Sequence, residues 1–278
     1  MMNRKWQYTA LSATILLLTG CGQTNQAVSS VHTPAVAASA AHSADTAATV
    51  PHWSYDQEHG PTHWAELETA FSTCRTGQQQ SPIDIEHAQL VPSATVHPVD
   101  IHYGTTPVTV INNGHTVQVN VQNTDNYITI EGQKYTLVQF HFHHPSEHQI
   151  DGKNAAMELH LVHKSADGQS AVLGVLIQPG NANRAFRQLW EHLPDHESEQ
   201  AIPLTEPVQL SHLLPADHHA VHYTGSLTTP PCTEHVSWTV LQQPIQLSKD
   251  QIQRFATIFP DNHRPVQSIG SRKLYTEQ

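Results

Sequence analysis

Apolar and polar residues alternate along most of the chain beyond residue 50, and this pattern predicts a protein built from β-strands. Two pairs of runs show the two-residue period of half-buried strands: 106–111 with 116–121, and 127–130 with 134–138. Asn113-Gly114 lies between the first pair and is a favoured dipeptide of tight hairpin turns. The pattern therefore predicts a meander of antiparallel strands.

Other periods add a buried strand and a few helices. Residues 170–177 form a continuous apolar run, which is typical of a strand buried on both faces. Residues 183–193 carry apolar side chains at helical spacing, and Ser248 is a good N-cap for a helix over 249–258. We expect a mainly β fold, α+β by strict count. It would be a single domain on a large, twisted, mostly antiparallel sheet with short peripheral helices and extended loops.

Two of the alternating runs place histidines on one face of this sheet. The residues that share the face are Gln139, His141 and His143 in the run 137–143, and Glu158, His160 and Val162 in the run 157–162. Phe140 and Phe142 point to the opposite face and form an apolar wall behind the first two histidines. If the two runs pair as antiparallel neighbours, three imidazoles converge on one point.

Three histidines around one point match the protein ligands of an open catalytic zinc site, in which the fourth position is left for water. Gln139 and Glu158 lie two residues from a ligand on the same face, so they are placed to accept hydrogen bonds from the other ring nitrogens. A chain with 23 histidines also produces a His-x-His pair by composition alone. Cobalt or iron could occupy the same three imidazoles.

Several longer motifs resemble segments of the α-class carbonic anhydrases, of the bacterial exported type. The zinc-binding and substrate-site segments match at 139–148, 158–163 and 223–232, the last containing Thr228-Thr229-Pro230-Pro231. Further matches are Trp53-Ser54-Tyr55, Gly60-Pro61-Thr62-His63-Trp64, Gln80-Ser81-Pro82, Asn112-Asn113-Gly114-His115 and Asp261-Asn262-His263-Arg264-Pro265. The resemblance covers the chain from about residue 50 to its end.

The resemblance implies reversible hydration of carbon dioxide to bicarbonate and a proton, through a zinc-bound hydroxide. The zinc ligands would be His141, His143 and His160, and Thr228 would orient the hydroxide while donating its own hydrogen to Glu147. A small apolar substrate pocket would be lined by Val162, Val172, Leu227, Thr229 and Trp238. Core packing is the alternative role of these pocket residues, and for Trp238 taken alone it is the better one.

The same resemblance assigns a proton shuttle. An acid with a pKa near 7 passes its proton to water too slowly for fast turnover, and histidine has the pKa that suits a relay. His115 matches the shuttle position, with Tyr55 and Asn113 organising the water chain; the alternative is one surface histidine among many. His144 and Gln118 depart from many animal members, which affects cavity shape and inhibitor preference. We expect His144 and His148 to be exposed to solvent rather than to bind a second metal.

The residue pattern of the first part of the chain is typical of a targeting segment. Residues 1–20 combine a basic head with an uncharged apolar stretch, as in a secretory signal peptide, and Leu18-Thr19-Gly20-Cys21 resembles a bacterial lipobox. Residues 21–50 are rich in Ala, Ser and Thr without a period and predict a flexible tether. We expect export to the periplasm or cell envelope, with Cys21 carrying a lipid anchor or standing as an incidental cysteine. The folded domain would occupy residues 51–278.

The cysteines fit an oxidising compartment. Exported members of the resembling family often join the loop before Gln-Ser-Pro to the residue after Thr-Thr-Pro-Pro, which implies a disulfide between Cys74 and Cys232. If Cys21 is lipidated, these two remain as an even pair. Two buried free thiols are the alternative.

Composition and charge narrow the function classes. The formal net charge is −11 with only 13 basic residues and no cluster of them, which argues against a nucleic-acid partner. A small-molecule substrate is expected, and a homodimer is compatible with the sequence. Two alternatives stay open: a catalytically inactive binding module with this fold, and a periplasmic metal buffer, although the tether holds only His32 and His42.

Overall fold

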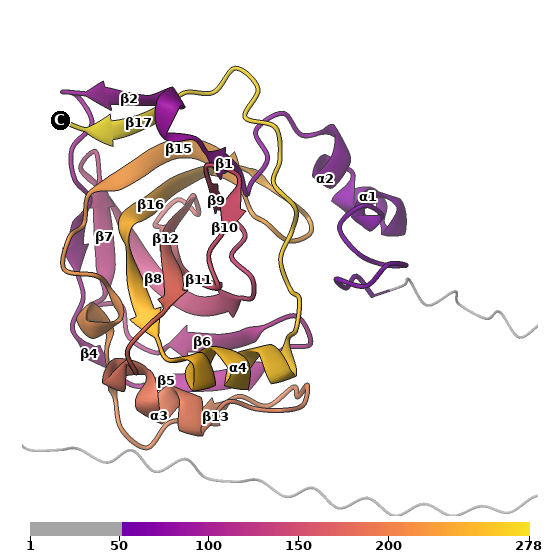
Figure 1. Cartoon of the computed structure of the whole chain (residues 1–278), viewed down its shortest axis with the longest axis vertical. Coiled ribbons are helices and arrows are strands. Elements are labelled where there is room, and N and C mark those ends of the chain that lie inside the picture. The colour runs from indigo at the N-terminus through magenta and orange to yellow at the C-terminus, as the bar shows by residue number, and fades with distance from the viewer. Residues whose placement is uncertain (1–51) are drawn as a thin grey trace, which may run out of the picture. The chain divides into compact units, whose positions relative to one another are not determined.

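The computed structural model describes residues 52–278, so the predictions for the signal peptide, the tether and Cys21 lie outside the described residues. Its centre is a twisted twelve-stranded sheet (Figure 1). The strands of this sheet are β2 (Leu90–Ser93), β3 (Asp100–His102), β5 (Val108–Asn112), β6 (Val117–Val121), β7 (Tyr127–Ile130), β8 (Gln133–His143), β11 (Met157–Ser165), β12 (Ser170–Pro179), β13 (Ile202–Pro203), β15 (Ala220–Ser226), β16 (Glu234–Leu247) and β17 (Leu274–Glu277). The mainly β fold class is confirmed.

The strand order is β13-β5-β6-β8-β11-β12-β16-β15-β17-β2, with β7 and β3 branching from β8. Most pairs are antiparallel, as predicted, but β12 with β16 and β17 with β2 are parallel. Two small sheets accompany the large one: β1 (Asp84–Ile85), β9 (Gln149–Ile150) and β10 (Lys153–Asn154), and β4 (Thr105–Thr106) with β14 (Val208–Gln209).

The register of the central strands decides where the predicted site lies. The runs 134–138 and 137–143 form one long strand, β8, which pairs antiparallel with β11 and puts His141 directly opposite His160. The next pairings set Val162 opposite Val172, and Val172 beside Trp238 of β16. Four neighbouring strands, β8, β11, β12 and β16, therefore carry the predicted ligands and strand-borne pocket residues on one continuous surface.

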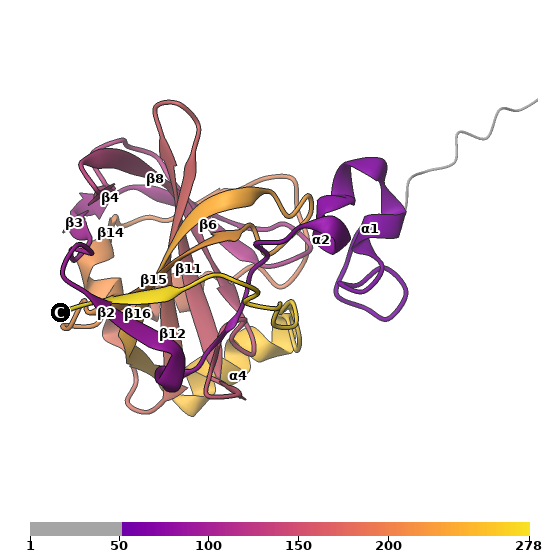
Figure 2. The ribbon, with the colours of Figure 1, turned by 90° about the horizontal axis from the view of Figure 1, so that it is seen from above.

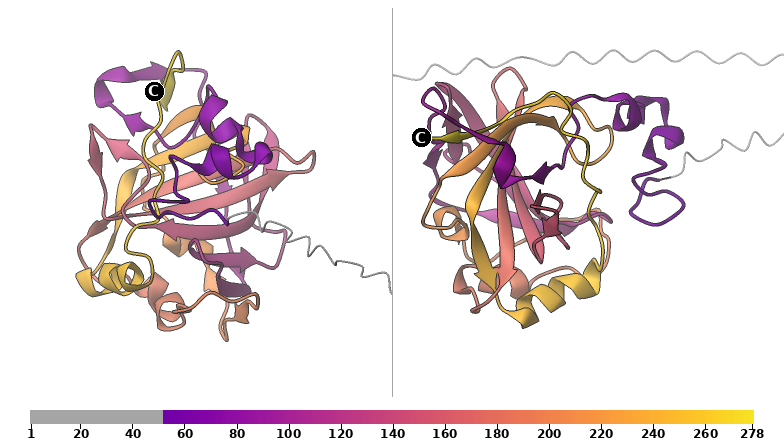
Figure 3. Two further views of the ribbon diagram at one scale, coloured as in Figure 1. Left: turned by 90° about the vertical axis from the view of Figure 1, so that its right-hand side faces the viewer. Right: turned by 45° about the horizontal axis from the view of Figure 1, so that its top comes forward.

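The helices are short and lie around the margin of the sheet (Figures 2 and 3). They are α1 (Trp64–Leu67), α2 (Thr73–Thr76), α3 (Arg187–Glu191) and α4 (Lys249–Ile258), with single 3-10 turns at Thr69–Phe71, His87–Gln89, Arg184–Phe186 and Leu210–Leu213. The predicted helix over 249–258 and its N-cap Ser248 are confirmed by α4. The structure adds a capping box, in which the Ser248 side chain accepts from the Gln251 N–H. The predicted helix over 183–193 is wrong in extent, since a 3-10 turn precedes α3 and Pro194 follows soon after it.

The two faces of β8 and β11 have different surroundings. Phe140 and Phe142 are fully buried and belong to the largest apolar cluster, where Phe142 meets Trp190 and Phe255 edge to face. Burying each such side chain stabilises the fold by about 1.5–3 kcal/mol. This wall fixes the strand so that the histidines must point to the other face. Among residues 52–278, no helix is both long and apolar enough to cross a membrane.

Candidate metal centre

Three histidine rings converge on the face of β8 and β11 opposite this apolar wall. Ring centroids are 5.0 Å apart for His141 and His143, 5.3 Å for His141 and His160, and 4.6 Å for His143 and His160. Each ring offers one nitrogen, and these nitrogens all lie within 4.8 Å of one another. His143 and His160 are buried and His141 is half-buried. The structure thus brings together the three residues that the strand alternation placed on one face.

The second nitrogen of each ring faces an oxygen acceptor. The pairs are His141 Nδ1 with Gln139 Oε1 at 2.8 Å, His143 Nδ1 with the main-chain oxygen of Asn262 at 2.7 Å, and His160 Nε2 with Glu158 Oε1 at 3.0 Å. This arrangement directs Nε2 of His141, Nε2 of His143 and Nδ1 of His160 to the common point. Asn262 was not identified from the sequence, because a main-chain acceptor carries no residue-type signal.

The chemistry of this donor set fits a zinc ion. Burial lowers the pKa of His141 well below its ordinary value and that of His143 to about 4, so both rings are neutral at neutral pH and keep a lone pair. Among the described residues, His143 Nε2 and Glu147 Oε2 are buried polar atoms without a hydrogen-bond partner, and they lie 3.6 Å apart. Such orphaned atoms gathered at one place indicate a ligand there.

A second group at the same place, His148 with Glu158 and His160, is a hydrogen-bond network instead. His148 Nδ1 bonds Glu158 Oε1 at 2.7 Å and its Nε2 bonds the Tyr223 hydroxyl at 2.7 Å, so no lone pair remains for a metal. Burial alone would raise the pKa of Glu158, but His148, His160 and their hydrogen bonds hold it well below its ordinary value. The expected exposure of His148 is wrong: it is fully buried, because this network satisfies both nitrogens.

Glu147 and Thr228 lie together beside the three histidines. Glu147 is fully buried, and its Oε1 accepts a hydrogen bond from the Arg264 main-chain N–H at 2.8 Å. Burial raises the pKa of Glu147, while His160 and a hydrogen bond from Thr228 lower it. The Thr228 hydroxyl therefore lies close to Glu147, although Oε2 of Glu147 accepts no well-formed hydrogen bond. The predicted pair is therefore adjacent. Glu147 Oε2 lies 3.6 Å from His143 Nε2, which places the pair next to the three histidines.

The predicted pocket residues form one wall next to the histidines. Val172 and Trp238 are buried in a second apolar cluster, and Val162 and Leu227 pack against it half-buried. The Trp238 ring lies 4.9 Å from the His160 ring. Thr229 is half-buried in the loop after Thr228, where its main-chain oxygen accepts from the Cys232 N–H at 2.9 Å. The strand register, rather than any single residue, creates this surface.

His115 lies in the turn between β5 and β6, in a stack of rings. Its ring is parallel to Trp53 at 3.5 Å between centroids and to His52 at 4.7 Å. Burial, followed by the proximity of His52, lowers the pKa of His115 to about 4. Asn113 Oδ1 fixes the turn by accepting the N–H groups of His115 and Thr116. The sequence did not predict this stack, although Trp53 belongs to a quoted motif.

Tyr55, the second predicted water-chain residue, lies edge-on to Trp53 and Trp64. Burial and the charge of Glu147 raise the pKa of Tyr55 well above its ordinary value, so its phenol is neutral.

His144 and Gln118 are the two positions that depart from many animal members. His144 Nδ1 bonds the main-chain oxygen of Pro260 at 2.9 Å, and Gln118 Nε2 donates to Asn120 Oδ1 at 2.7 Å. The two departures are therefore engaged in local hydrogen bonds.

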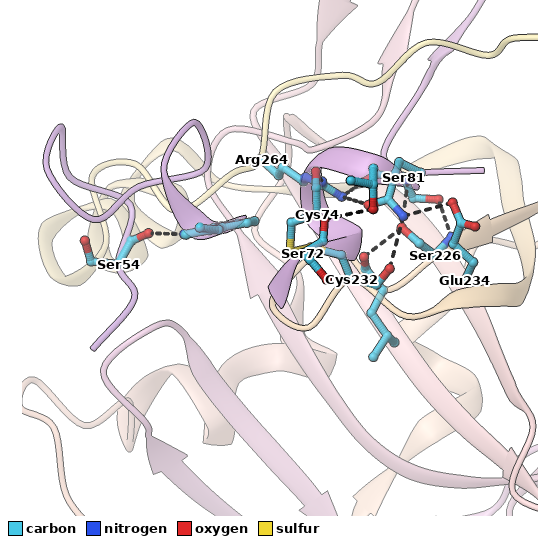
Figure 4. Close-up of a disulfide and its surroundings, with 12 residues drawn as sticks. Ser54, Ser72, Cys74, Ser81, Ser226, Cys232, Glu234 and Arg264 are labelled. Carbon is cyan, nitrogen blue, oxygen red and sulfur yellow. Dashed lines mark hydrogen bonds between the residues drawn. A yellow bond between two sulfur atoms is a disulfide. The ribbon is translucent and has the colours of Figure 1, made fainter. Parts of the chain in front are cut away.

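Cys74 and Cys232 form a disulfide (Figure 4). It joins α2 to the loop that follows Thr228, across 158 positions of sequence. Both cysteines are buried with Trp64 in a small cluster of their own. The predicted pairing is confirmed.

Comparison with known proteins gives a consistent result. The family model described as eukaryotic-type carbonic anhydrase matches residues 59–278. Carbonic anhydrases of Nostoc and of Klebsiella pneumoniae are each 43% identical to the chain, over 79% and 80% of it and 84% and 89% of their own length. The solved α-carbonic anhydrase of Thermovibrio ammonificans with the inhibitor sulfanilamide has a TM-score of 0.78 at 38% identity, covering 81% of this chain and 98% of that one. Dioscorin complexed with ascorbate has a TM-score of 0.76 at 29% identity, covering 81% and 98%.

Proposed function

Because the chain belongs to the eukaryotic-type, or α, carbonic anhydrase family, we propose that it hydrates carbon dioxide reversibly to bicarbonate and a proton, with zinc as its metal. The observation that carries this proposal is the convergence of three neutral imidazole lone pairs beside the buried Glu147. An inactive member of the fold would not need to keep these costly buried polar groups together.

His141, His143 and His160 would hold the zinc ion, each through the nitrogen left free by its oxygen partner. A zinc ion in such a site lowers the pKa of water to about 7 and so supplies a nucleophile at neutral pH. Gln139, Asn262 and Glu158 fix the ring orientations, which keeps the three lone pairs aimed at one point.

Glu147 and Thr228 select the orientation of the reacting oxygen. Glu147 accepts the Arg264 N–H at one oxygen, so its other oxygen remains for the Thr228 hydroxyl. When Thr228 donates its only hydrogen to Glu147, its own oxygen can only accept. The reacting oxygen must then turn its hydrogen toward Thr228 and a lone pair toward the substrate. Val162, Val172, Leu227 and Trp238 supply an apolar surface for carbon dioxide there.

His115 would carry the proton that each turnover releases. In the stack with Trp53 its pKa is lowered to about 4, which keeps the ring neutral at neutral pH and eases release of a proton to solvent. The same shift makes the stacked ring a weaker proton acceptor than an unperturbed histidine, whose pKa is about 6.5. Tyr55 and Asn113 would order water between the ring and the metal centre. Replacing His115 with alanine should slow turnover while leaving zinc bound, and added imidazole should restore part of the rate.

We also propose that the protein is exported through residues 1–20 and anchored by a lipid at Cys21, with residues 21–50 as the tether. The Cys74–Cys232 disulfide supports export, because disulfides persist in oxidising compartments. Radiolabelled fatty acid should be incorporated into the wild-type chain and lost in Cys21→Ser.

Stopped-flow measurement of carbon dioxide hydration tests the activity, using the purified chain before chelation, after chelation and after zinc is returned. We expect fast turnover that disappears with the metal and returns with about one zinc per chain. A folded, zinc-loaded protein without turnover would contradict the enzyme assignment and favour a binding module. Binding of several zinc ions per chain would favour a metal buffer.

A further inference from the structure

One short segment, residues 261–264, touches three parts of the candidate site. The main-chain oxygen of Asn262 faces His143 Nδ1 at 2.7 Å, and the Asn262 side-chain amide donates to the main-chain oxygen of His115 at 3.0 Å. Two residues later the Arg264 N–H donates to Glu147 Oε1 at 2.8 Å. The way this segment is held therefore affects the positions of His143, of the turn that carries His115, and of Glu147.

The side chain of Arg264 holds the segment to the disulfide-bridged part of the chain (Figure 4). Its guanidinium donates three hydrogen bonds of 2.8 Å, to Gln80 Oε1 and to the main-chain oxygens of Ser81 and Cys74. Gln80 in turn donates to the main-chain oxygen of Cys232 at 3.1 Å. One arginine thus connects both sides of the disulfide, directly or through Gln80.

Burying this arginine needs an explanation, because its side chain is only 1% exposed in the folded chain. Removing a cation from water is costly, and an apolar side chain of similar volume often stabilises a protein more. Burial lowers the pKa of Arg264 to about 10 while the charge of Glu147 opposes this, so the guanidinium stays protonated at neutral pH. What the arginine provides is a rigid fork with several fixed donors.

We propose that Arg264 is a positioning residue: by anchoring residues 262–264 to the segment 74–81, its guanidinium aligns the main-chain groups that hold Glu147 and His143. The inference rests on the proposed function, because those two residues matter for rate only if the site hydrates carbon dioxide. Arg264 acts through the backbone and touches neither the substrate nor the metal.

The test compares Arg264→Gln and Arg264→Lys with Arg272→Gln in the full, zinc-loaded chain. Arg272 is the matched control, since its guanidinium also donates three hydrogen bonds, in this case to the main-chain oxygens of Ile269, Thr224 and Ser268. Its own N–H donates to Ile269 rather than to a site residue. The measurements are kcat/KM and kcat for carbon dioxide hydration, and the zinc dissociation constant by chelator competition.

We expect Arg264→Gln to lower kcat/KM about 10- to 100-fold, because a small misplacement of an orienting group has effects of this size. The kcat should fall less, since it includes proton release, and the zinc dissociation constant should rise about tenfold. Arg264→Lys should recover only a small part of both losses, because an ammonium group keeps some donors but lacks the fork that reaches all three oxygens. Arg272→Gln should change neither quantity.

Equal losses in kcat and kcat/KM with unchanged zinc affinity, or the same losses in Arg272→Gln, would overturn the proposal in favour of a purely structural arginine. If Arg264→Gln does not fold, Arg264→Lys is compared with the wild-type chain, because it keeps the charge without the fork. Lower kcat/KM and weaker zinc binding in this variant would support the proposal, and wild-type values would overturn it. Inactivity of the zinc-loaded wild-type chain would instead refute the proposed function. The zinc dissociation constants would still show whether Arg264 positions His143.

Discussion

Strand β11 carries two buried histidines three residues apart, and they have different surroundings. His160 is 1% exposed and His163 is 0% exposed, and burial lowers the pKa of both rings. His163 has both nitrogens engaged: Nδ1 with the main-chain oxygen of Ala171 at 3.2 Å, and Nε2 with the Tyr103 hydroxyl at 2.6 Å. His160 presents a nitrogen to two other rings.

The comparison teaches that burial does not make a histidine a ligand. An odd separation along a strand puts His160 and His163 on opposite faces of the sheet, so each meets a different set of neighbours. His163 finds a phenol and a carbonyl, which saturate a neutral ring. His160 finds other imidazoles whose second nitrogens are already fixed, and only a shared cation can satisfy all of them. Substituting His160 and His163 separately tests this distinction.

The largest effect should come from removing the ligand. We expect His160→Ala to reduce bound zinc from about one per chain to near zero and turnover to the background rate, because two imidazoles do not complete the site. The apolar wall of Phe140 and Phe142 is untouched, so the circular dichroism of the sheet should persist. Zinc content after dialysis is the measurement, and retention of zinc would refute the ligand assignment.

The matched substitution on the other face should affect stability instead. His163→Gln removes the ring that accepts from Tyr103, and leaving a buried hydroxyl poorly satisfied costs about 1–3 kcal/mol. Denaturant unfolding of the zinc-loaded protein should show this loss, while zinc content and turnover change less than twofold. A loss of zinc in this variant would break the comparison.

The pH dependence of stability separates the two roles further. Burial lowers the pKa of His163 to about 3 in the folded chain, against an unperturbed value of about 6.5. Between these values the unfolded chain binds the extra proton, so stability falls as pH drops, with a slope of up to ~1.4 kcal/mol per pH unit from this residue. Unfolding of zinc-free protein at several pH values should show a shallower slope in His163→Gln. An identical slope would contradict the assigned cause.

A smaller effect concerns His115, a third kind of histidine whose surroundings cover it only in part. Trp53→Ala should raise the pKa of His115 from about 4 toward 6.5, because the indole that desolvates the ring is removed. Titration of the ring protons by NMR measures this. Tyr127→Ala is the control, since Tyr127 stacks on His102 instead. A pKa that stays at about 4 would show that the stack is not the cause.

Much of this arrangement follows from residue patterns. The alternation in β8 and β11 placed His141, His143 and His160 on one face, and the start of α4 was predicted from Ser248 as its N-cap. These features depend on neighbours close in sequence or on a fixed period. They could therefore be derived without knowing the rest of the fold.

Other features depend on contacts between distant segments. The main-chain groups of Asn262 and Arg264 meet His143 and Glu147 across 119 and 117 positions, and a main-chain group looks the same in every residue type. The burial of His148 required knowing that Tyr223 closes its network. The parallel pairing of β12 with β16 brings Trp238 beside Val172, and no local pattern distinguishes it from an antiparallel pair.

The most direct test of the convergence is an anomalous-difference map at the zinc absorption edge from crystals of the zinc-loaded chain. The account predicts one strong peak bonded to Nε2 of His141, Nε2 of His143 and Nδ1 of His160, at about 2.0–2.1 Å from each. A peak between His148, Glu158 and His160, or zinc bound only at surface histidines, would contradict it.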